Sequence, residues 1–387
     1  MISTILIFLV VLSVLVFVHE LGHFYTARRL GVRAEEFGLG FPPRLFGWYR
    51  NSQGRWRQMI GSASVESLEK NDDKNKRLRP GSTLYSLNIL PIGGFVRIKG
   101  ENGEGQDEPD SFGYQSVSKR IIILSAGVIM NILLAWVLLS GGYMLGLPQA
   151  ADEVGSDARL TDAQVVVMDV LADSPAQSSG LKVGDIILSV DGRSVSTERD
   201  LQDSIAARAD KNTQLSIKRG DQDINIEAIP TTIDPGKPAT IGISIFSSGL
   251  VSYPFLSALW QGAKTTVWLI QEIFGAFVGL FSQLFSGQDV SNEFAGPIGI
   301  ANITGQAAQL GWSYLLQFAA LLSLNLAVLN IIPFPALDGG RILFVLIEKI
   351  KGRPISREIE VLIHNAGFFL LIALVIFITY KDIIKLF

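Results

Sequence analysis

The chain has three histidines, and two of them belong to the sequence His19-Glu20-Leu21-Gly22-His23. Side chains four residues apart share one face of a helix, so this spacing aligns two imidazoles with a carboxylate beside them. Two imidazoles can bind zinc, and the carboxylate can act as a general base. The motif lies in an uncharged apolar stretch that begins at Met1. Because ionisable side chains are costly in lipid, the pattern predicts a metal-dependent hydrolytic site inside a membrane.

Composition points to a protein that crosses a membrane several times. Of 387 residues 48% are hydrophobic and 18% charged, and the mean hydropathy is +0.34. The apolar residues are concentrated in long runs, as in membrane helices. The predicted spans cover residues 1–27, 121–147, 313–350 and 359–381. Arg28 and Arg29 follow the first span instead of preceding it, so we expect a retained helix and not a cleaved signal peptide.

Charge and cysteine content restrict the partners and the metal ligands. The net charge of −3 gives no basic field that would attract nucleic acid. Cysteine is absent, so a transition metal must be bound by His, Asp or Glu. Lipid is the expected environment of the apolar runs.

The charges between the spans predict the orientation of the chain. Residues 28–120 contain 16 Lys/Arg and 11 Asp/Glu, residues 147–253 contain 9 and 16, and residues 341–357 contain 5 and 1. Basic loops favour the cytoplasmic side. Four spans with both termini outside the cytoplasm place the two basic segments inside and the acidic segment outside.

Residues 250–312 form a fifth apolar region with two possible interpretations. A crossing between 254 and 285 would place the basic 341–357 segment outside, and the region carries Lys264 and Glu272. We therefore prefer a pair of interfacial amphipathic helices.

Two segments outside the spans have β character. Within the cytoplasmic insert 28–120, residues 84–99 predict a β-hairpin around a Pro-x-Gly-Gly turn, and residues 32–48 predict a bent segment near the membrane interface. Residues 163–231 contain short alternating strands and one helix, which predicts a small extracytoplasmic domain.

Zinc requires a third protein ligand, and two residues are candidates. His364 lies near the start of the fourth span, where a polar residue at a helix end is an adequate explanation. Asp338 follows Pro333 and Pro335, which break the third span, and Gly339 and Gly340 allow close approach to a metal. Broken backbone is tolerated at membrane depth only inside protein or beside a cavity, so we prefer Asp338.

Polar residues of three spans lie at a similar depth. His19 lies nine residues before Arg28, Asn131 eleven after Arg120, and Asp338 eleven before Lys349. With the rise of a helix, these residues are roughly 13–17 Å from the cytoplasmic surface. Water could therefore reach them from the cytoplasm by a short path.

The combination of motifs resembles the site-2 protease family, especially its bacterial zinc metalloproteases of regulated intramembrane proteolysis. The motifs are HELGH in the first span, Gly127-x-x-x-Asn131 in the second, and Asn330-x-x-Pro-x-Pro-x-Leu-Asp-Gly-Gly in the third, with EFGLGF, LPIGGFVRIKGE and GPIGI elsewhere. The resemblance implies that His19, His23 and Asp338 bind Zn²⁺ and that Glu20 is the catalytic acid/base. It implies that Asn330 and Asn131 hold substrate or stabilise the oxyanion, and that the 84–99 hairpin pairs with an unwound substrate strand.

The domain at 163–231 resembles a circularly permuted PDZ domain, through Ser174-Pro175-Ala176, Gly180-Leu181, Gly184-Asp185 and Val190-Asp191-Gly192. PDZ domains bind extended peptides at a sheet edge, and exclusion of large substrates by bulk is the alternative role. Val128 stands where the family usually has proline, which leaves the aim of Asn131 open.

The expected fold is thus a multi-pass α-helical membrane protein with four transmembrane helices, a cytoplasmic β-hairpin insert and one extracytoplasmic PDZ domain. The expected function is intramembrane zinc endopeptidase in a bacterial cytoplasmic (inner) membrane. Its partners would be single-span membrane proteins, such as an anti-sigma factor or a remnant signal peptide, and a peptide or upstream-cleaved substrate terminus bound by the PDZ domain. A PDZ-tethered membrane scaffold with a structural metal site is the alternative. Metal transport is disfavoured because four spans without a repeated polar pattern provide no second gate.

Overall fold

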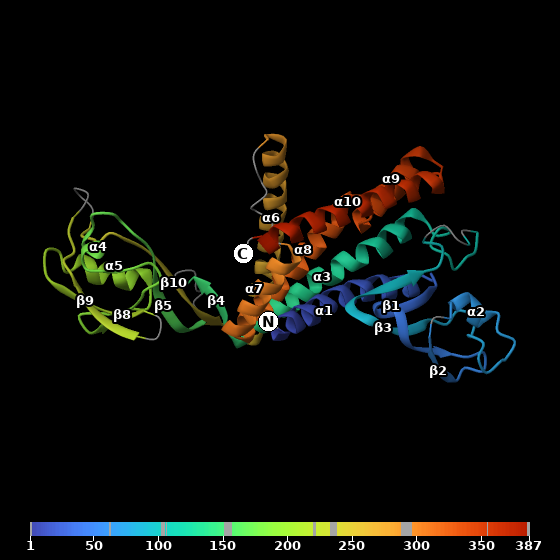
Figure 1. The fold of residues 1–387 in the computed structure, drawn as a ribbon, viewed down its shortest axis with the longest axis horizontal. Helices are drawn as coiled ribbons and strands as arrows, with labels where there is room; N and C mark the ends of the chain where they lie inside the picture. The colour runs from blue at the N-terminus through green and yellow to red at the C-terminus, as the bar shows by residue number, and fades with distance from the viewer. Residues whose placement is uncertain are drawn as a thin grey trace. The chain divides into compact units, whose positions relative to one another are not determined.

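The structure is a computed structural model that describes residues 2–61, 63–101, 105, 107–150, 157–219, 222–232, 238–287, 296–353 and 355–384 (Figure 1). The chain divides into two compact units. We call Met1–Leu138 with Ala263–Phe387 the membrane unit, and Leu139–Gly262 the inserted unit.

The membrane unit is mainly helical. The helices with residues in it are α1 (Ile2–Arg29), α2 (Val65–Glu69), α3 (Val117–Leu145), α6 (Phe255–Phe285), α7 (Pro297–Leu310), α8 (Trp312–Ile331), α9 (Asp338–Lys351) and α10 (Arg357–Ile384). Among the described residues four helices are long and apolar enough to cross a membrane, namely α1, α3, α8 and α10. They match the four predicted spans, and the protein is a multi-pass membrane protein.

The third span is interrupted, as the two prolines predicted. Helix α8 ends at Ile331, and α9 begins at Asp338 after a short non-helical segment. Proline has no N–H group and blocks the preceding turn, so Pro333 and Pro335 end the helix. The interruption places Asp338 at the N-terminus of a new helix.

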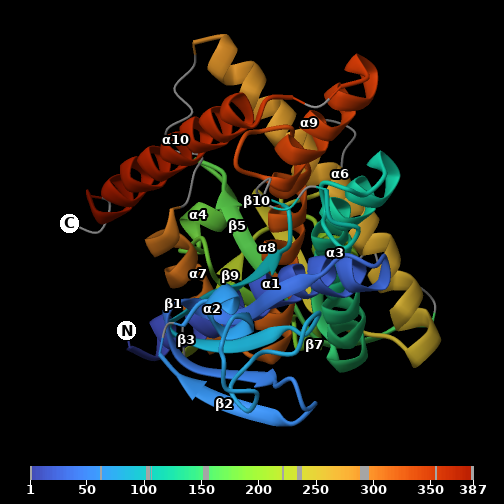
Figure 2. The ribbon, with the colours of Figure 1, turned by 90° about the vertical axis from the view of Figure 1, so that its right-hand side faces the viewer.

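The segment 28–120, predicted as a cytoplasmic insert, contains more β-structure than one hairpin. Strands β1 (Ala34–Arg50), β2 (Trp56–Ile60) and β3 (Leu84–Ile98) form a sheet in the order β2-β1-β3 (Figure 2). The predicted hairpin 84–99 lies in β3, but its two arms do not pair with each other in the described sheet. Each arm pairs with β1, so that Phe37 lies opposite both Tyr85 and Val96. The segment 32–48, predicted as bent, lies mostly in β1, whose register with β3 shifts between Phe41 and Arg44. The pairing partners lie about 50 residues away along the sequence, and local residue patterns do not reveal such pairing.

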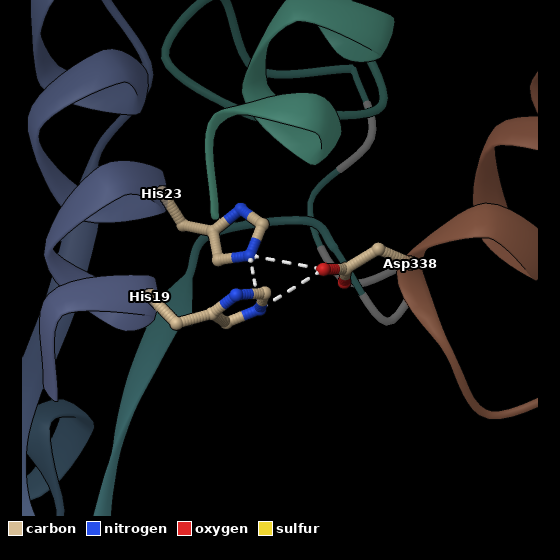
Figure 3. A group of neighbouring side chains, drawn as sticks. All are labelled: His19, His23 and Asp338. Carbon is tan, nitrogen blue, oxygen red and sulfur yellow. Dashed lines mark hydrogen bonds and ion pairs between the residues drawn. The ribbon is translucent and has the colours of Figure 1, made fainter. Parts of the chain in front are cut away.

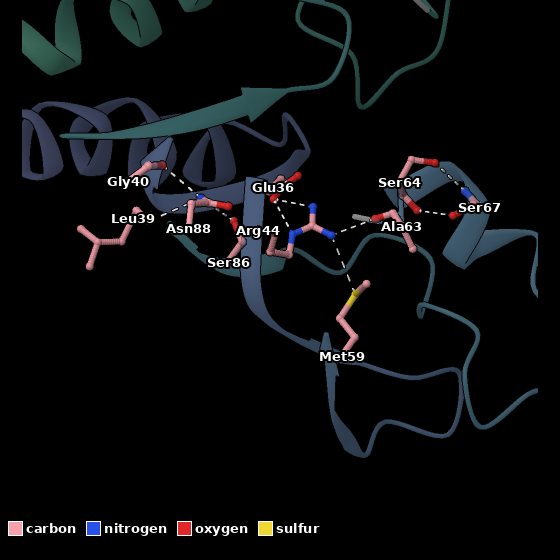
Figure 4. Close-up of polar contacts among 10 residues, drawn as sticks. All are labelled: Glu36, Leu39, Gly40, Arg44, Met59, Ala63, Ser64, Ser67, Ser86 and Asn88. Atoms are coloured by element: carbon pink, nitrogen blue, oxygen red, sulfur yellow. Dashed lines mark hydrogen bonds and ion pairs between the residues drawn. The ribbon is translucent and has the colours of Figure 1, made fainter. Parts of the chain in front are cut away.

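Buried polar contacts fix the bend within β1 (Figure 4). The Arg44 guanidinium donates to Glu36 Oε1 at 2.7 Å and to the Ala63 carbonyl at 2.8 Å. Asn88 of β3 donates to the Gly40 carbonyl at 3.0 Å. Both members of the Arg44–Glu36 ion pair are almost fully buried. Because a buried ionised group needs its partner, these contacts favour one conformation of the sheet.

Charged side chains also fix the end of β3. Lys99 follows the strand and donates to carboxylates of Glu108 and Asp110. Burial alone would lower the pKa of Lys99, but the hydrogen bonds to Asp110 and Glu108 outweigh it and raise that pKa. Lys99 therefore stays protonated and links the strand to the following loop.

The inserted unit is built around an antiparallel sheet with two short helices. Its strands are β4 (Leu147–Ala150), β5 (Arg159–Val170), β6 (Ile186–Val190), β7 (Arg193–Ser194), β8 (Thr213–Arg219), β9 (Gln222–Ala228) and β10 (Ile243–Ser252), and its helices are α4 (Pro175–Ser178) and α5 (Glu198–Ala206). Alternate strand residues such as Val165, Val167, Leu215 and Ile217 are buried in one core.

This sheet extends beyond the predicted limits 163–231. Strand β10 pairs with β5 and also with β4, so residues near 147 and 250 belong to the same sheet. The prediction was too short because β10 finds its partner about 80 residues earlier in the chain, and only tertiary contact reveals this. The strands and helices otherwise agree with the PDZ-like arrangement expected from the sequence.

Asp185, one of the residues behind the PDZ resemblance, has a structural role. It is 1% exposed and accepts from the Arg219 guanidinium at 2.7 Å and from the Lys182 N–H group at 2.9 Å. Burial alone would raise the pKa of Asp185, but these hydrogen bonds outweigh it and lower that pKa. Asp185 therefore stays ionised and joins the end of β8 to the turn before β6.

The region 250–312, predicted as a pair of interfacial helices, contains the end of β10 and the two helices α6 and α7. Among the described residues, α6 is not one of the four helices that are long and apolar enough to cross a membrane. Helix α7 is packed and not free on a surface, because Gly305 touches Thr4 of α1 and leaves no room for a Cβ atom. Asp382 of α10 accepts from the N–H groups of Gly296 and Gly299 at the α7 N-terminus. The prediction did not foresee this packing because the contacts come from both ends of the chain.

Candidate metal centre and active site

Helix α1 brings two histidines to a carboxylate that lies more than 300 residues later in the chain. Figure 3 shows His19 and His23 pointing from α1 towards Asp338, which points back from the start of α9. Asp338 Oδ2 lies 3.0 Å from His19 Nε2 and 3.2 Å from His23 Nε2, and the two Nε2 atoms are 3.1 Å apart. Both histidines are 6% exposed. The structure therefore brings together the three residues that the sequence proposed as ligands.

The surroundings of His23 and Asp338 leave two of the central atoms without a proton to share. His23 Nδ1 lies 2.8 Å from the carbonyl oxygen of Ile123, which can only accept, so Nδ1 carries the proton. In a neutral imidazole Nε2 is then an acceptor. Asp338 Oδ2 is also an acceptor, and it is buried without a hydrogen-bond donor. Acceptor atoms that converge in a buried space repel one another unless a cation lies between them.

The donor set fits zinc. Two imidazole nitrogens and one carboxylate oxygen are a known catalytic ligand set, which leaves a fourth position for water or substrate. Ligand atoms at zinc–nitrogen distances and tetrahedral angles lie about 3.3 Å apart, close to the separations found here. Among the described residues, His19, His23 and Asp338 form the group that could hold a metal ion.

Two glycines allow the segment before α9 to fold tightly enough to present Asp338. A Cβ atom on Gly339 would lie 2.3 Å from the carbonyl oxygens of Ile331 and Ile332, and one on Gly340 would lie 2.2 Å from that of Phe334. Backbone atoms cannot move aside as a flexible side chain can. The Asp-Gly-Gly sequence is therefore required by close packing of the backbone around the end of α8.

His364, the alternative third ligand, supports the same segment from α10. Its Nδ1 accepts from the N–H group of Ala336 at 2.9 Å, and its ring lies 5.2 Å from that of Phe344. Ala336 has a φ of 75°, a left-handed conformation that is unfavourable for alanine. The contact with His364 helps to hold this conformation two residues before Asp338. The structure thus agrees with the choice of Asp338 over His364.

Helix α3 faces the imidazoles along one stripe of residues spaced by four. The carbonyl of Ile123 accepts from His23, and the side chain of Asn131 lies 3.3 Å from His19 Nδ1. Between them, a Cβ atom on Gly127 would lie 2.4 Å from His23 Nε2 and 2.7 Å from His19 Nε2. We call Ile123, Gly127 and Asn131 the α3 stripe. It supplies no side-chain ligand of the metal group, but it contacts both rings.

Glu20 lies on an adjacent face of α1, directed towards the sheet. Its Oε2 accepts from the N–H group of Val96 in β3 at 3.0 Å. Phe17 and Phe24, which share this face, contact Phe37 of β1 with ring centroids 5.4 and 4.8 Å apart. The aromatic contacts hold the sheet against α1, and the hydrogen bond fixes the carboxylate beside the histidines.

The Val96 contact shows that one edge of β3 faces Glu20. Residues 94–98 pair with β1 on their other side, with Val96 opposite Phe37. Backbone groups of alternate residues in an antiparallel strand point to the same side. Because the N–H group of Val96 points to Glu20, those of Gly94 and Ile98 are directed away from β1 as well. This edge of the sheet therefore borders the candidate active site.

Asn330 is the predicted site residue that the structure does not connect to the imidazoles. It is half-buried in the last turn of α8, eight residues before Asp338. Among the described residues no hydrogen bond joins its side chain to His19, His23 or Asp338. Its role stays a prediction.

Sequence patterns missed several groups that the structure places at or near the site. They are the Ile123 carbonyl, the Val96 N–H group, Ser323, which donates to the Asn131 carbonyl at 2.8 Å, and the ion pair of Arg341 with Glu101. Backbone groups carry no residue signature. The Arg341–Glu101 pair joins α9 to the loop after β3. Glu101 ends the LPIGGFVRIKGE motif, but nothing in the spacing of that motif implies a contact with Arg341.

The two histidines on a membrane helix, the distant aspartate and the adjacent glutamate define a class of metal-dependent hydrolases. The family model of peptidase family M50 matches residues 7–80 and 75–374. The chain belongs to peptidase family M50, the site-2 protease family. It is a zinc metalloendopeptidase of the site-2 protease type.

Relatives of similar length support this assignment. The chain is 33% identical to the Clostridium perfringens protein CPE1693, with 97% of both chains covered. It is 30% identical to the regulator of sigma-W protease RasP of Bacillus subtilis, with 100% of this chain and 99% of the relative covered. A crystal structure of the PDZ domain of an SdrC-like protein from Listeria monocytogenes is 28% identical, with a TM-score of 0.21, and covers 22% of this chain and 92% of that domain.

The close approach of α3 to the imidazoles predicts the effect of a small substitution. In Gly127→Ala the added methyl group must displace both rings, and overpacking of this kind costs about 1–3 kcal/mol. We expect zinc affinity to fall roughly 5- to 150-fold. The measurement is zinc binding by the detergent-solubilised chain in competition with a chromophoric chelator.

Gly141→Ala is the matched control, because a Cβ atom at this position of the same helix meets no heavy atom within 4 Å. It should bind zinc as the wild type does. Equal zinc affinity of the Gly127→Ala and Gly141→Ala variants would contradict the geometry described here.

Proposed function

We propose that this enzyme hydrolyses a peptide bond within the transmembrane segment of another membrane protein. His19, His23 and Asp338 are the proposed zinc ligands, and Glu20 is the proposed acid/base. The observation that carries the proposal is the convergence of three buried acceptor atoms on membrane helices directly beside Glu20 and the edge of β3. A scaffold with a structural metal site would need neither a free carboxylate nor a sheet edge at the metal.

The chemistry requires proton transfer by Glu20. Zinc, when bound, lowers the pKa of a water molecule and polarises the scissile carbonyl. Glu20 takes a proton from the water as the water oxygen attacks the carbonyl carbon. Glu20 then gives this proton to the leaving nitrogen as the C–N bond breaks. The N–H group of Val96 holds one carboxylate oxygen of Glu20, which leaves the other for the water.

We propose that Asn330 holds the substrate backbone or donates a hydrogen bond to the oxyanion of the tetrahedral intermediate. Its position before the break between α8 and α9 supports this role, because the break exposes a polar end of α8 near the start of α9. The resemblance implies the same role for Asn131, but its contact with His19 supports a different one.

The sheet edge provides a way to bind the substrate. A helical substrate must unwind before cleavage, and its free N–H and C=O groups then need partners inside the membrane. The N–H group of Gly94 and the carbonyl groups of Gly94 and Val96, which face the same side, can provide them by strand addition. A strand bound there would lie next to Glu20, which supports β3 as the substrate-binding edge.

The proposed substrates are single-span membrane proteins. A relative is named a regulator of sigma-W protease, which supports a membrane-bound regulator such as an anti-sigma factor as one candidate. A remnant signal peptide is the other.

We propose that the inserted unit binds an extended peptide or the upstream-cleaved terminus of the substrate. Strand β4 pairs with residues 248–251 of β10, so no described strand covers residues 243–246 on that side. An uncovered strand edge of this kind can accept a peptide strand, whereas exclusion of large substrates by bulk would not need it.

We also propose that the chain lies in a bacterial cytoplasmic membrane, with both termini and the inserted unit outside the cytoplasm. The basic residues of 28–120 and 341–357 support this orientation.

The role of Glu20 predicts a separation of zinc binding from catalysis. Glu20→Gln keeps the size and the hydrogen bond from Val96 but cannot take the proton. We expect cleavage of a tagged single-span reporter to fall at least about 100-fold, the contribution typical of a general base, with zinc affinity retained. Glu66→Gln, at an exposed glutamate of α2, is the control and should cleave normally. Cleavage by Glu20→Gln at the wild-type rate would exclude Glu20 as the base.

The edge of β3 predicts a specific effect of removing one N–H group. Val96→Pro deletes the donor to Glu20, and proline is tolerated where a strand N–H group faces away from its partner. We expect reporter cleavage to fall about tenfold or more, because one charge-assisted hydrogen bond contributes about 1.5–3 kcal/mol. Val96→Leu keeps the N–H group and should cleave normally. The prediction fails if the proline and leucine variants cleave equally while both bind zinc.

The absence of cysteine makes the orientation directly measurable. Lys211→Cys in the inserted unit and Lys74→Cys in the cytoplasmic insert are both at exposed positions. A membrane-impermeant maleimide should label the cysteine at 211 in intact spheroplasts and the cysteine at 74 only after permeabilisation. Labelling in the opposite order would reverse the proposed orientation.

A further inference from the structure

Asn131 is a fully buried polar residue whose hydrogen bonding is incomplete. Its side chain is 0% exposed, and its Nδ2 lies 3.3 Å from His19 Nδ1. Its Oδ1 is buried without a hydrogen-bond partner. A buried amide oxygen without a donor is costly, so this arrangement needs an explanation.

The protonation of His19 provides the explanation. His19 Nε2 faces His23 and Asp338, so zinc would bind to this nitrogen. In a neutral imidazole bound to a metal through Nε2, the proton is on Nδ1, which must then donate a hydrogen bond. The amide nitrogen of Asn131 cannot accept it, whereas the amide oxygen can.

A rotation of the amide by 180° exchanges its nitrogen and oxygen without changing its shape. In the orientation given, Oδ1 has no partner, so the neighbour at His19 Nδ1 decides between the two orientations. The Nδ1–H group of His19 selects the orientation with Oδ1 towards the ring.

We propose that Asn131 is a positioning residue for zinc binding, whose Oδ1 accepts from the Nδ1–H group of His19. This inference rests on the proposed zinc ligands. Both ligand histidines then donate to an oxygen of the α3 stripe, His23 to the Ile123 carbonyl and His19 to the Asn131 amide. Such a partner fixes the tautomer and orientation of the ring and increases its basicity as a ligand.

The backbone of Asn131 is held independently of its side chain. Ser323 of α8 donates to the Asn131 carbonyl at 2.8 Å, and Gly127 one turn earlier lets α3 approach the rings. Asn131 is therefore fixed in position by the packing of α3 against α1 and α8. A change of its side chain tests the contact to His19 without removing this support.

Two substitutions distinguish an acceptor at position 131 from a donor. Asn131→Ala removes both groups, and we expect zinc affinity to fall about 10- to 100-fold, as is typical for loss of such a partner. Asn131→Asp keeps an oxygen for His19 and removes the NH₂ group, so zinc affinity should be restored to at least the wild-type level. Zinc affinity is measured on the detergent-solubilised full chain with a chromophoric chelator.

A spectroscopic measurement and a control variant complete the test. In the Co²⁺-substituted chain, the visible absorption should change in the Asn131→Ala variant and return towards that of the wild type in Asn131→Asp. Ser323→Ala removes the contact to the Asn131 backbone only, and any loss of zinc affinity should be much smaller than that in Asn131→Ala.

Three results would overturn the proposal. These are zinc affinity of Asn131→Ala equal to that of the wild type, a loss in Asn131→Asp as large as in Asn131→Ala, or an equal loss in Ser323→Ala. Full zinc affinity with loss of cleavage in both Asn131 variants would instead identify a donor to the oxyanion. Failure of the proposed function can be distinguished from failure of this inference. If the proposed zinc ligands are wrong, zinc binding by the wild-type chain will not depend on His19 and His23.

Discussion

The structure depends on the convergence of three acceptor atoms in a space from which water is largely excluded. His19, His23 and Asp338 place two nitrogens and one oxygen within about the separation of zinc ligands. Without a cation these atoms would repel one another, and in lipid the cost of such an arrangement is larger than in water. The arrangement therefore favours a metal site, and the surrounding elements can be understood by how they maintain it.

Small residues let the helices approach closely enough to maintain this site. Gly22 of α1 lies against the Ala126 carbonyl of α3, and Gly127 lies against both imidazoles. Gly339 and Gly340 do the same for the segment that carries Asp338. Between membrane helices there is little hydrophobic driving force, so close van der Waals packing and interhelical hydrogen bonds hold them together. The same contacts that stabilise the bundle thus determine the positions of the ligands.

The site joins two kinds of structure that serve different steps. Helices α1, α3 and α9 hold the metal group, whereas the sheet of β1, β2 and β3 brings a strand edge to Glu20. Phe17 and Phe24 connect them, because they lie on the same face of α1 as Glu20 and contact Phe37 of the sheet. An enzyme that cleaves within a helix needs both parts: a fixed catalytic centre, and backbone groups that replace the hydrogen bonds lost when the substrate unwinds.

The sequence by itself determined the four spans, the break at Pro333 and Pro335, and the choice of His19, His23, Glu20 and Asp338, because composition, helical spacing and the cost of charge in lipid are local properties. It could not determine the extent of either sheet, since β1 with β3, and β5 with β10, pair residues that are far apart in the chain. The packing of α7 on Thr4 and Asp382 was unpredictable for the same reason. Tertiary structure alone decided that the Ile123 carbonyl and the Val96 N–H group lie at the site and that Asn131 contacts His19, because only the packing of the helices and the sheet brings these groups together.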